Sequence, residues 1–219
     1  MKQVLVIAGP SAGGKTTVAT GLIDMTDGAF EIVRSLTTRE PRGDLFDGEY
    51  LYTDREGFER ELSRGRILEH TEYSGELYGT PVSEIERIIS SGKTPILILD
   101  LNGISSVLKR KDVLSPCVVY VYCHPTTFES RLRARYLSDN NDPTSHRKYK
   151  SRLEKNFKDY ESMPRRAADF YAFLCNESSA ENTAAALCEI FDGFCSGKEK
   201  DEASNIAAAE LIKRFADEK

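Results

Sequence analysis

Positive charge is not in excess in this sequence of 219 residues. Its 30 Lys and Arg face 35 Asp and Glu, which gives a formal net charge of -5. Proteins that bind duplex nucleic acid draw most of their non-specific affinity from many Lys and Arg that neutralise phosphates. The acidic balance therefore excludes a nucleic-acid polymer as the main partner. Any anionic ligand has to be held by a local cluster of positive groups.

The sequence also lacks a Cys-x-x-Cys pair and a long hydrophobic run. No segment approaches the roughly 18 consecutive apolar residues that a membrane span needs. The apolar run at residues 1–8 is too short for a signal peptide. An odd number of cysteines favours reduced thiols over a disulfide framework or a zinc site, so we expect a cytoplasmic protein that is not embedded in a membrane. The five are Cys117, Cys123, Cys175, Cys188 and Cys195.

What the sequence does contain is an alternation of short apolar runs, rich in β-branched residues, with longer segments of helical periodicity. This pattern predicts an α/β fold with a central parallel sheet flanked by helices. The predicted strands are residues 4–8, 94–99, 118–123 and 170–175. The predicted helices are residues 15–25, 82–91, 104–110, 126–136, 146–161 and 180–194.

Three segments depart from this alternation and suggest a domain organisation. Residues 35–81 hold several Gly, two Pro, many tyrosines and an amphipathic segment at 54–63, which predicts an inserted lobe. Residues 137–150, rich in Asp, Asn and Ser, are predicted as a lid loop. Residues 196–219 are predicted as a linker and an extra helix, which leaves both a monomer and a homodimer open. The core domain would then comprise residues 1–34, 82–136 and 151–195.

The first predicted strand is followed directly by a glycine-rich loop that matches the pattern G-x-x-x-x-G-K-[ST]. Small residues let backbone N–H groups curl around phosphate oxygens, and the helix that follows adds the partial positive charge of its N-terminus. Lys15 is expected to bridge the β- and γ-phosphates of a nucleoside triphosphate, and the Thr16 hydroxyl is expected to ligate Mg²⁺. The loop consists of Gly9, Pro10, Ser11, Ala12, Gly13, Gly14, Lys15 and Thr16.

This phosphate loop does not by itself say what is done with the nucleotide. Asp100 and Gly103 fit the D-x-x-G pattern of a GTPase switch, but a GTPase also needs an N-K-x-D guanine reader, and none occurs. Asp100 at the end of a predicted strand fits a Walker-B-like role or a substrate-binding role equally well. The sequence therefore favours a phosphotransferase.

The predicted lobe carries groups that suit a guanine nucleotide monophosphate. Arg39 and Arg42 are three residues apart, with Pro41 stiffening the segment between them, and can grip one phosphate by paired charged hydrogen bonds. Tyrosine hydroxyls can supply further donors. A carboxylate such as Glu69 can accept from the N1–H and the exocyclic amine of guanine, an edge that adenine does not present.

In these motifs and in their order, the sequence closely resembles the guanylate kinase family from about Val4 to Asn176. The resemblance implies a P-loop nucleoside monophosphate kinase fold, ATP as co-substrate, Mg²⁺, and GMP as the phosphoryl acceptor. It implies a GMP site made of Ser35, Arg39, Arg42, Tyr50, Glu69, Tyr78, Gly79, Thr80 and Asp100. It implies an ATP site made of residues 9–16 together with Thr17, Arg131, Arg135 and Asn176. Lys15, Arg39, Arg135 and Arg152 would be the catalytic residues.

The sequence departs from the family pattern in three places. Ile98 stands where the family usually has the first Asp of an Asp-x-Asp strand, so we expect Thr16, the phosphates and water to carry the metal. The segment between Arg42 and Tyr50 is one residue shorter than expected, and the lid loop is several residues longer. Two alternatives stay open: a related P-loop kinase for another phosphorylated acceptor, such as a ribose phosphate, and a non-catalytic interaction module that binds a phosphorylated peptide.

Overall fold

A computed structural model describes residues 2–41, 48, 50–73, 75–110, 114–137 and 143–217 of the protein. Arg42, which the sequence places in the GMP site, lies outside these residues. The chain divides into two compact units. The first unit comprises Met1–Val6 and Thr26–Pro116, and the second comprises Ile7–Met25 and Cys117–Lys219.

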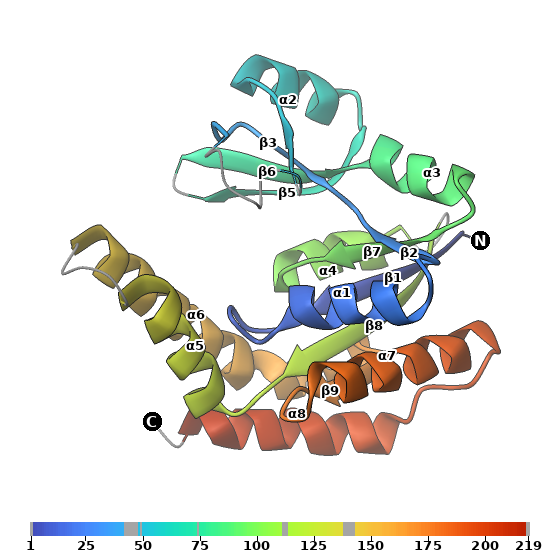
Figure 1. Ribbon diagram of the computed structural model, residues 1–219. Coiled ribbons are helices and arrows are strands. Elements are labelled where there is room, and N and C mark those ends of the chain that lie inside the picture. Colours follow the sequence, from blue (N-terminus) through green and yellow to red (C-terminus); the bar gives the residue numbers. More distant parts are fainter. Residues whose placement is uncertain are drawn as a thin grey trace. The chain divides into compact units, whose positions relative to one another are not determined.

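A five-stranded sheet with flanking helices forms the centre of the fold (Figure 1). Residues 4–8 of its strand β1 are all buried, as expected for a strand that is covered on both faces. β2 pairs in parallel with β7, and β8 with β9, so the predicted α/β class is confirmed. The strand order is β2-β7-β1-β8-β9, with β1 at Lys2–Ala8, β2 at Phe30–Ile32, β7 at Thr94–Ile98, β8 at Leu114–Tyr122 and β9 at Ala172–Cys175.

The first unit contains a second, four-stranded sheet of order β4-β3-β6-β5. Its strands are β3 at Ser35–Thr37, β4 at Tyr50–Tyr52, β5 at Ile67–Tyr73 and β6 at Glu76–Pro81. The predicted amphipathic segment is helix α2, Arg55–Ser63, which begins after Asp54 because that side chain accepts from the Gly57 N–H at 2.7 Å. The helices α3, Val82–Ser90, and α4, Leu101–Leu108, complete this unit.

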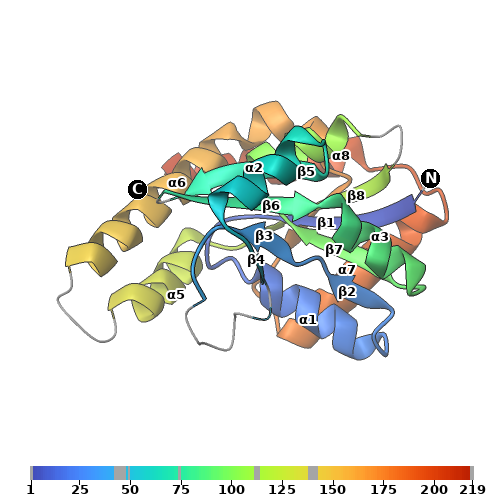
Figure 2. The ribbon, with the colours of Figure 1, turned by 90° about the horizontal axis from the view of Figure 1, so that it is seen from above.

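The second unit is mainly helical. α1 packs against α7, and α6 packs against both α5 and α8. Figure 2 shows α5 and α6 side by side, as Figure 1 does from the other direction. Within the described residues, none of the helices is both long and apolar enough to cross a membrane. The helices are α1 at Lys15–Met25, α5 at Pro125–Leu137, α6 at Pro143–Arg166, α7 at Ala180–Cys195 and α8 at Glu202–Asp217.

Several predicted boundaries differ from the observed ones. α6 begins at Pro143, so the part of the predicted lid loop from residue 143 to 150 is helical; proline fits the first turn of a helix, where its missing N–H is not needed. β9 begins at Ala172, because the Phe170 N–H bonds to Ala167 O at the end of a short 3-10 helix. The three-residue strand β2 was not predicted, since three residues are too few for a periodicity.

The buried face of α8 provides a test of how this helix is held. Ile212 is fully buried and its neighbour Leu211 is 41% exposed. Ile212→Ala is expected to lower the free energy of unfolding by about 2–5 kcal/mol, because it removes buried methyl groups and leaves a cavity. Urea denaturation measures this change, and Leu211→Ala is the matched control, for which we expect less than about 1 kcal/mol. Equal losses for the two variants would contradict the observed packing.

Candidate active site

The phosphate loop, residues 9–16, joins β1 to α1 in a conformation that needs glycine at two points. Gly9 has φ 151°, and a Cβ there would lie 2.0 Å from Val121 O. Gly14 has φ 91°, and a Cβ there would lie 2.2 Å from Asn176 Nδ2. Both backbone angles and both close approaches exclude a side chain. The sequence therefore folds locally into a tight loop that ends at the first turn of a helix, which is the arrangement that binds phosphates.

Lys15 lies folded over the phosphate loop. Its Nζ donates to the carbonyl oxygens of Gly9 at 2.9 Å and Pro10 at 2.8 Å. Burial lowers the pKa of Lys15 from 10.5 to about 8, and the nearby positive charge of Arg152 contributes to the lowering. Asp159 opposes this shift only in part, and a bound polyphosphate would add further negative charge beside the ammonium group.

The second unit has a polar cavity of about 220 Å³ at the phosphate loop. Its walls include the phosphate loop and two arginines that the sequence predicts as catalytic, Arg135 on α5 and Arg152 on α6. Arg152 Nη1 also lies 3.5 Å from Ser11 Oγ. The cavity thus gathers positive groups around a helix N-terminus, which suits a polyanion. The lining residues are Ser11, Ala12, Gly14, Lys15, Thr16, Thr17, Arg135, Tyr136 and Arg152.

Two further residues predicted for the ATP site contact carbonyl groups of the phosphate loop. Asn176 is buried, and its Nδ2 donates to Gly13 O at 2.8 Å. Its Oδ1 accepts from the Thr183 hydroxyl at 3.2 Å, which fixes the orientation of the amide. Arg131, on α5, donates from Nη1 to Ala12 O at 3.3 Å. The structure therefore places both residues beside the loop.

Sequence reasoning missed Asn156, a residue of α6 that also holds the phosphate loop. Its side chain is 1% exposed, and its Oδ1 accepts from the Ser11 N–H at 2.7 Å. Its Nδ2 donates to Ser11 O at 3.0 Å. The available signal was a buried stripe at helical spacing in a polar helix, formed by Tyr149, Asn156, Tyr160 and Met163.

The residues at this loop fit a magnesium nucleotide better than a dedicated protein metal site. Thr16 and Thr17 are exposed in the cavity and offer hydroxyl oxygens. Among the described residues, no group of three or more His, Cys, Asp and Glu side chains could hold a metal ion. Mg²⁺ prefers oxygen ligands, keeps several waters and is commonly held through substrate phosphates with one or two protein oxygens. A single hydroxyl beside a phosphate loop is compatible with that pattern.

Predicted GMP-site residues come together in the first unit as two clusters. In the first cluster, the guanidinium carbon of Arg39 lies 5.0 Å from the ring centre of Tyr50 and 5.8 Å from that of Tyr52. Arg39 Nη2 donates to Tyr52 Oη at 3.3 Å. The rings of Tyr50 and Tyr78 are 6.1 Å apart and meet edge to face. Arg39 is thus positioned by two aromatic rings that carry hydroxyl groups, and a third such ring packs on Tyr50.

The strand register explains how these residues meet. β3 pairs in parallel with β4, so that Ser35 is opposite Tyr50 and Thr37 is opposite Tyr52. β3 also pairs antiparallel with β6, which puts Tyr78 opposite Thr37. Gly79 lies opposite Leu36 in the same pairing. Sequence reasoning missed Tyr52 as a contact of Arg39, although residues i and i+2 of a strand share a face, so that Tyr50 could have indicated it.

The second cluster surrounds Glu69 on β5. The Thr80 hydroxyl donates to Glu69 Oε1 at 2.5 Å. Burial raises the pKa of Glu69, and the negative charge of Asp100 raises it further, while the Thr80 hydrogen bond lowers it. A Cβ on Gly103 would lie only 3.3 Å from Glu69 Oε2. The carboxylate is therefore partly desolvated and is held by the Thr80 hydroxyl.

Asp100 has a structural function besides its predicted role in guanine binding. It is the N-cap residue of α4, and its Oδ1 accepts from the N–H groups of Asn102 and Gly103, each at 3.0 Å. This cap explains why α4 begins at Leu101, three residues before the predicted start. It also fixes the carboxylate just beyond the end of β7, near Glu69.

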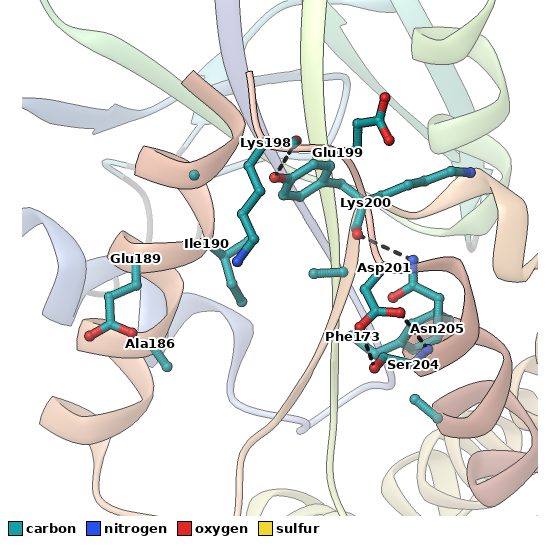
Figure 3. A pocket seen from close by; sticks show the side chains of 14 residues that line it. Phe173, Ala186, Glu189, Ile190, Lys198, Glu199, Lys200, Asp201, Ser204 and Asn205 are labelled. Atoms are coloured by element: carbon teal, nitrogen blue, oxygen red, sulfur yellow. Dashed lines mark hydrogen bonds between the residues drawn. The ribbon is translucent and has the colours of Figure 1, made fainter. Parts of the chain in front are cut away.

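The second unit also holds a larger cavity of about 360 Å³, between β9, α7 and α8 (Figure 3). Its polar groups bond to one another: Tyr171 Oη donates to Lys198 O at 2.9 Å, and Asn205 Nδ2 donates to Tyr171 O at 3.2 Å. Side chains of both charge signs line it, including Lys200 and Glu189. We place the candidate site at the phosphate loop, where positive groups gather.

Comparison with known proteins gives a consistent result. A family model described as guanylate kinase matches residues 1–193. A guanylate kinase of Lactobacillus delbrueckii subsp. bulgaricus is 34% identical over 136 residues, or 60% of this chain and 65% of the relative. One of Rubrobacter xylanophilus is 36% identical over 60% of this chain and 66% of the relative. The chain thus spans just under two thirds of these two relatives.

A plant relative and a solved structure extend the comparison. "Guanylate kinase 1" of Arabidopsis thaliana is 38% identical over 61% of this chain, but that match spans 35% of the plant protein. The crystal structure of guanylate kinase from Anaplasma phagocytophilum covers 88% of this chain and 86% of its own, with a TM-score of 0.58 and 23% identity. At this identity the likeness shows the fold, that of a P-loop nucleoside monophosphate kinase.

Proposed function

Because the chain belongs to the guanylate kinase family, we propose that it transfers the γ-phosphoryl group of ATP to GMP, giving ADP and GDP. The observation that carries this proposal is the half-buried Glu69 carboxylate, bonded to Thr80 and close to Asp100. That group has the acceptors that the guanine edge requires. The phosphate loop alone would suit any nucleoside triphosphate.

On the donor side, the backbone N–H groups of residues 9–16 and the N-terminus of α1 would bind the ATP phosphates. Lys15 would leave its two carbonyl partners for the β- and γ-phosphates. Arg135 and Arg152 line the same cavity and would neutralise charge on the transferring group. Arg131 and Asn176 would hold the outer side of the loop, with Asn176 near the adenine.

Mg²⁺ would be held by the Thr16 hydroxyl, phosphate oxygens and water, since Ile98 offers no carboxylate on β7. When bound, the ion neutralises negative charge on the β- and γ-phosphates. The chain's own contribution is the hydroxyl ligand and the cavity that surrounds it.

On the acceptor side, Arg39 would bind the GMP phosphate together with the hydroxyls of Tyr50 and Tyr78, and the sequence adds Arg42 to this group. Guanine would be bound by a second set of residues in the same unit. Gly79, between Tyr78 and Thr80 on β6, would serve through its backbone, because a Cβ there would lie 2.8 Å from Ile67 and 3.0 Å from Phe58. Ionised Glu69 would accept from both N1–H and the exocyclic amine. Adenine offers no N1–H, so this carboxylate would select against AMP. The guanine set consists of Ser35, Glu69, Thr80 and Asp100.

Little covalent chemistry is required of the protein in phosphoryl transfer. Catalysis would come from in-line placement of a GMP phosphate oxygen against the γ-phosphorus, with charge stabilised by Lys15, Arg39, Arg135 and Arg152. Donor and acceptor groups belong to different compact units. We therefore include in the proposal a closure on binding both substrates, which excludes water and limits ATP hydrolysis.

A coupled ADP-release assay with ATP and Mg²⁺ tests the proposal. GMP, AMP, CMP, UMP and ribose phosphates are offered as acceptors at equal concentration. We expect release with GMP to exceed release with every other acceptor. Faster release with a ribose phosphate would favour a related P-loop kinase, and no release with any acceptor would favour a non-catalytic binding module.

A cytoplasmic location and a small-molecule substrate pair complete the proposal. All five cysteines are free thiols, which suits a reducing compartment. A monomer or a homodimer remains the prediction for the assembly, and light scattering coupled to size-exclusion chromatography tests it.

Glu69→Gln tests the proposed guanine contact through its pH dependence. The amide cannot accept from both guanine donors, so we expect kcat/KM for GMP at pH 8 to fall by a factor that corresponds to about 1–3 kcal/mol of lost transition-state stabilisation. In the unaltered protein, kcat/KM for GMP should decline as the pH falls through the raised pKa of Glu69, because the protonated carboxyl loses an acceptor. This acid limb should be absent from the variant.

The matched control for this experiment is Glu72→Gln on the same strand, which is exposed. Its pH profile should coincide with that of the unaltered protein. An unchanged profile in Glu69→Gln would remove Glu69 from the guanine site.

A further inference from the structure

Three successive carbonyl groups of the phosphate loop are held by side chains from distant parts of the second unit. Asn156 binds Ser11 O, Arg131 binds Ala12 O and Asn176 binds Gly13 O. In a trans peptide, the C=O of one residue and the N–H of the next point in opposite directions, and the described chain has no cis peptide bond. Anchoring the carbonyls therefore fixes the directions of the N–H groups that follow them.

Asn156 differs from the other two anchors because it binds both backbone groups of one residue. Its Oδ1 accepts from the Ser11 N–H at 2.7 Å, and its Nδ2 donates to Ser11 O at 3.0 Å. The amide is 1% exposed, so water does not replace these bonds easily. The side chain consequently sets the orientation of both peptide groups that flank the Ser11 Cα.

The residue that follows is in an unfavourable backbone conformation. Ala12 has φ 61°, in the left-handed region that residues with a Cβ rarely adopt. Such a conformation persists only where its surroundings determine it. Ala12 lies in the wall of the nucleotide cavity, so its conformation shapes the site.

We propose that Asn156 is a positioning residue for nucleotide binding: its two hydrogen bonds to Ser11 hold the phosphate loop in the conformation that keeps Ala12 left-handed. We call these two hydrogen bonds the Asn156 clasp. The inference rests on the proposed use of the loop for ATP. Without the clasp, the loop relaxes toward conformers in which Ala12 is not strained. Nucleotide affinity then falls in proportion to the fraction of molecules whose loop keeps the binding-competent conformation.

The same helix links this clasp to a proposed catalytic group. Arg152 precedes Asn156 by four residues on α6, so the two side chains lie on one helical face. Arg152 approaches Ser11 Oγ while Asn156 holds the Ser11 backbone. The loop and the arginine are therefore aligned by one element, and the clasp sets their mutual position.

The experiment measures binding of ADP with Mg²⁺ by calorimetry for the unaltered protein, Asn156→Ala, Ala12→Gly and the double variant. We expect Asn156→Ala to weaken ADP binding by about 10- to 100-fold, as two buried hydrogen bonds are lost. Glycine adopts the left-handed conformation without strain. When Ala12→Gly is already present, the loss caused by Asn156→Ala should therefore shrink at least threefold.

Asn205→Ala is the matched control. Asn205 is also buried and also donates to two backbone carbonyls, those of Phe170 and Tyr171, outside the nucleotide cavity. We expect it to lower the Tm as Asn156→Ala does, with the ADP Kd unchanged. In steady-state kinetics, Asn156→Ala should raise KM for ATP far more than KM for GMP. Asn156→Leu fills the same space and replaces Asn156→Ala if the latter does not fold.

Three results would overturn the inference. One is an ADP Kd within twofold of the unaltered value in Asn156→Ala or Asn156→Leu. Another is an equal loss of affinity with and without Ala12→Gly, which would make the clasp independent of the strained residue. The third is an absence of ADP binding to the unaltered protein. Normal ADP binding without transfer to GMP would overturn the proposed function alone.

Discussion

Lys15→Met is expected to lower kcat for ADP formation with GMP by at least about 10²–10³-fold, the scale found when one preorganised donor to a developing charge is removed. Lys15 is the charged group of the phosphate loop, where its Nζ contacts Gly9 O and Pro10 O. Methionine fills similar space without the charge. The coupled ADP-release assay at saturating ATP and GMP measures the effect.

Lys150→Met is the control for this variant, since Lys150 is an exposed residue of α6 and carries the same charge. Its kcat should remain within twofold of the unaltered value. A kcat for Lys15→Met that stays within tenfold would mean that the lysine does not act on the transferring phosphoryl group.

The free energy of unfolding of the unliganded protein should depend on pH through Lys15. The pKa of Lys15 is about 8 in the folded protein and 10.5 ordinarily, so the unfolded chain binds more protons between these values. The free energy of unfolding should therefore rise with pH from 8 to 10.5, by at most about 3 kcal/mol from this group. Lys15→Met should lack that rise. Urea denaturation at a series of pH values measures it.

Arg39→Met should reduce kcat/KM for GMP by about 10²-fold and leave KM for ATP close to its original value. The guanidinium would make charged hydrogen bonds to the GMP phosphate, each contributing about 1.5–3 kcal/mol. Tyr50 and Tyr52 lie against it at 5.0 and 5.8 Å, so the donors are preorganised. Initial-rate kinetics with each substrate varied in turn separate the two effects.

Arg39→Lys and Arg55→Met sharpen this test. Lysine keeps the charge but not the planar pair of donors, so kcat/KM for GMP in Arg39→Lys should lie between the values of the unaltered protein and Arg39→Met. Arg55 lies on α2 of the same unit and is exposed. Losing its charge should leave kcat/KM for GMP within twofold. Equal losses in Arg39→Met and Arg55→Met would indicate a general effect of charge and remove Arg39 from the GMP phosphate site.

The sequence allowed the parts of the candidate site that are local in the chain to be identified. The phosphate loop is eight consecutive residues whose types are dictated by backbone geometry, so the motif could be identified without a structure. The cluster of Arg39, Tyr50 and Tyr78 was accessible because its members belong to, or directly follow, neighbouring strands of one small sheet. The α/β class followed from strands that are buried on both faces, as β1 is.

Where sequence reasoning failed, the deciding contact is remote in sequence or made by an unexpected residue type. Asn156 is 145 residues from Ser11, and within a highly charged helix only its spacing with Tyr149, Tyr160 and Met163 distinguishes that amide. In α8 the buried face includes Asn205, a polar residue that is retained because its Nδ2 donates to two backbone carbonyls. An apolar pattern does not include such a residue.

α8 has a consequence for where this protein can be divided. The match to the family ends at residue 193, and α8 begins at Glu202. Yet α8 packs along α6, the helix that carries both Asn156 and Arg152. A cut made at the end of the family match would therefore remove a helix that packs on the element carrying both of these phosphate-loop contacts.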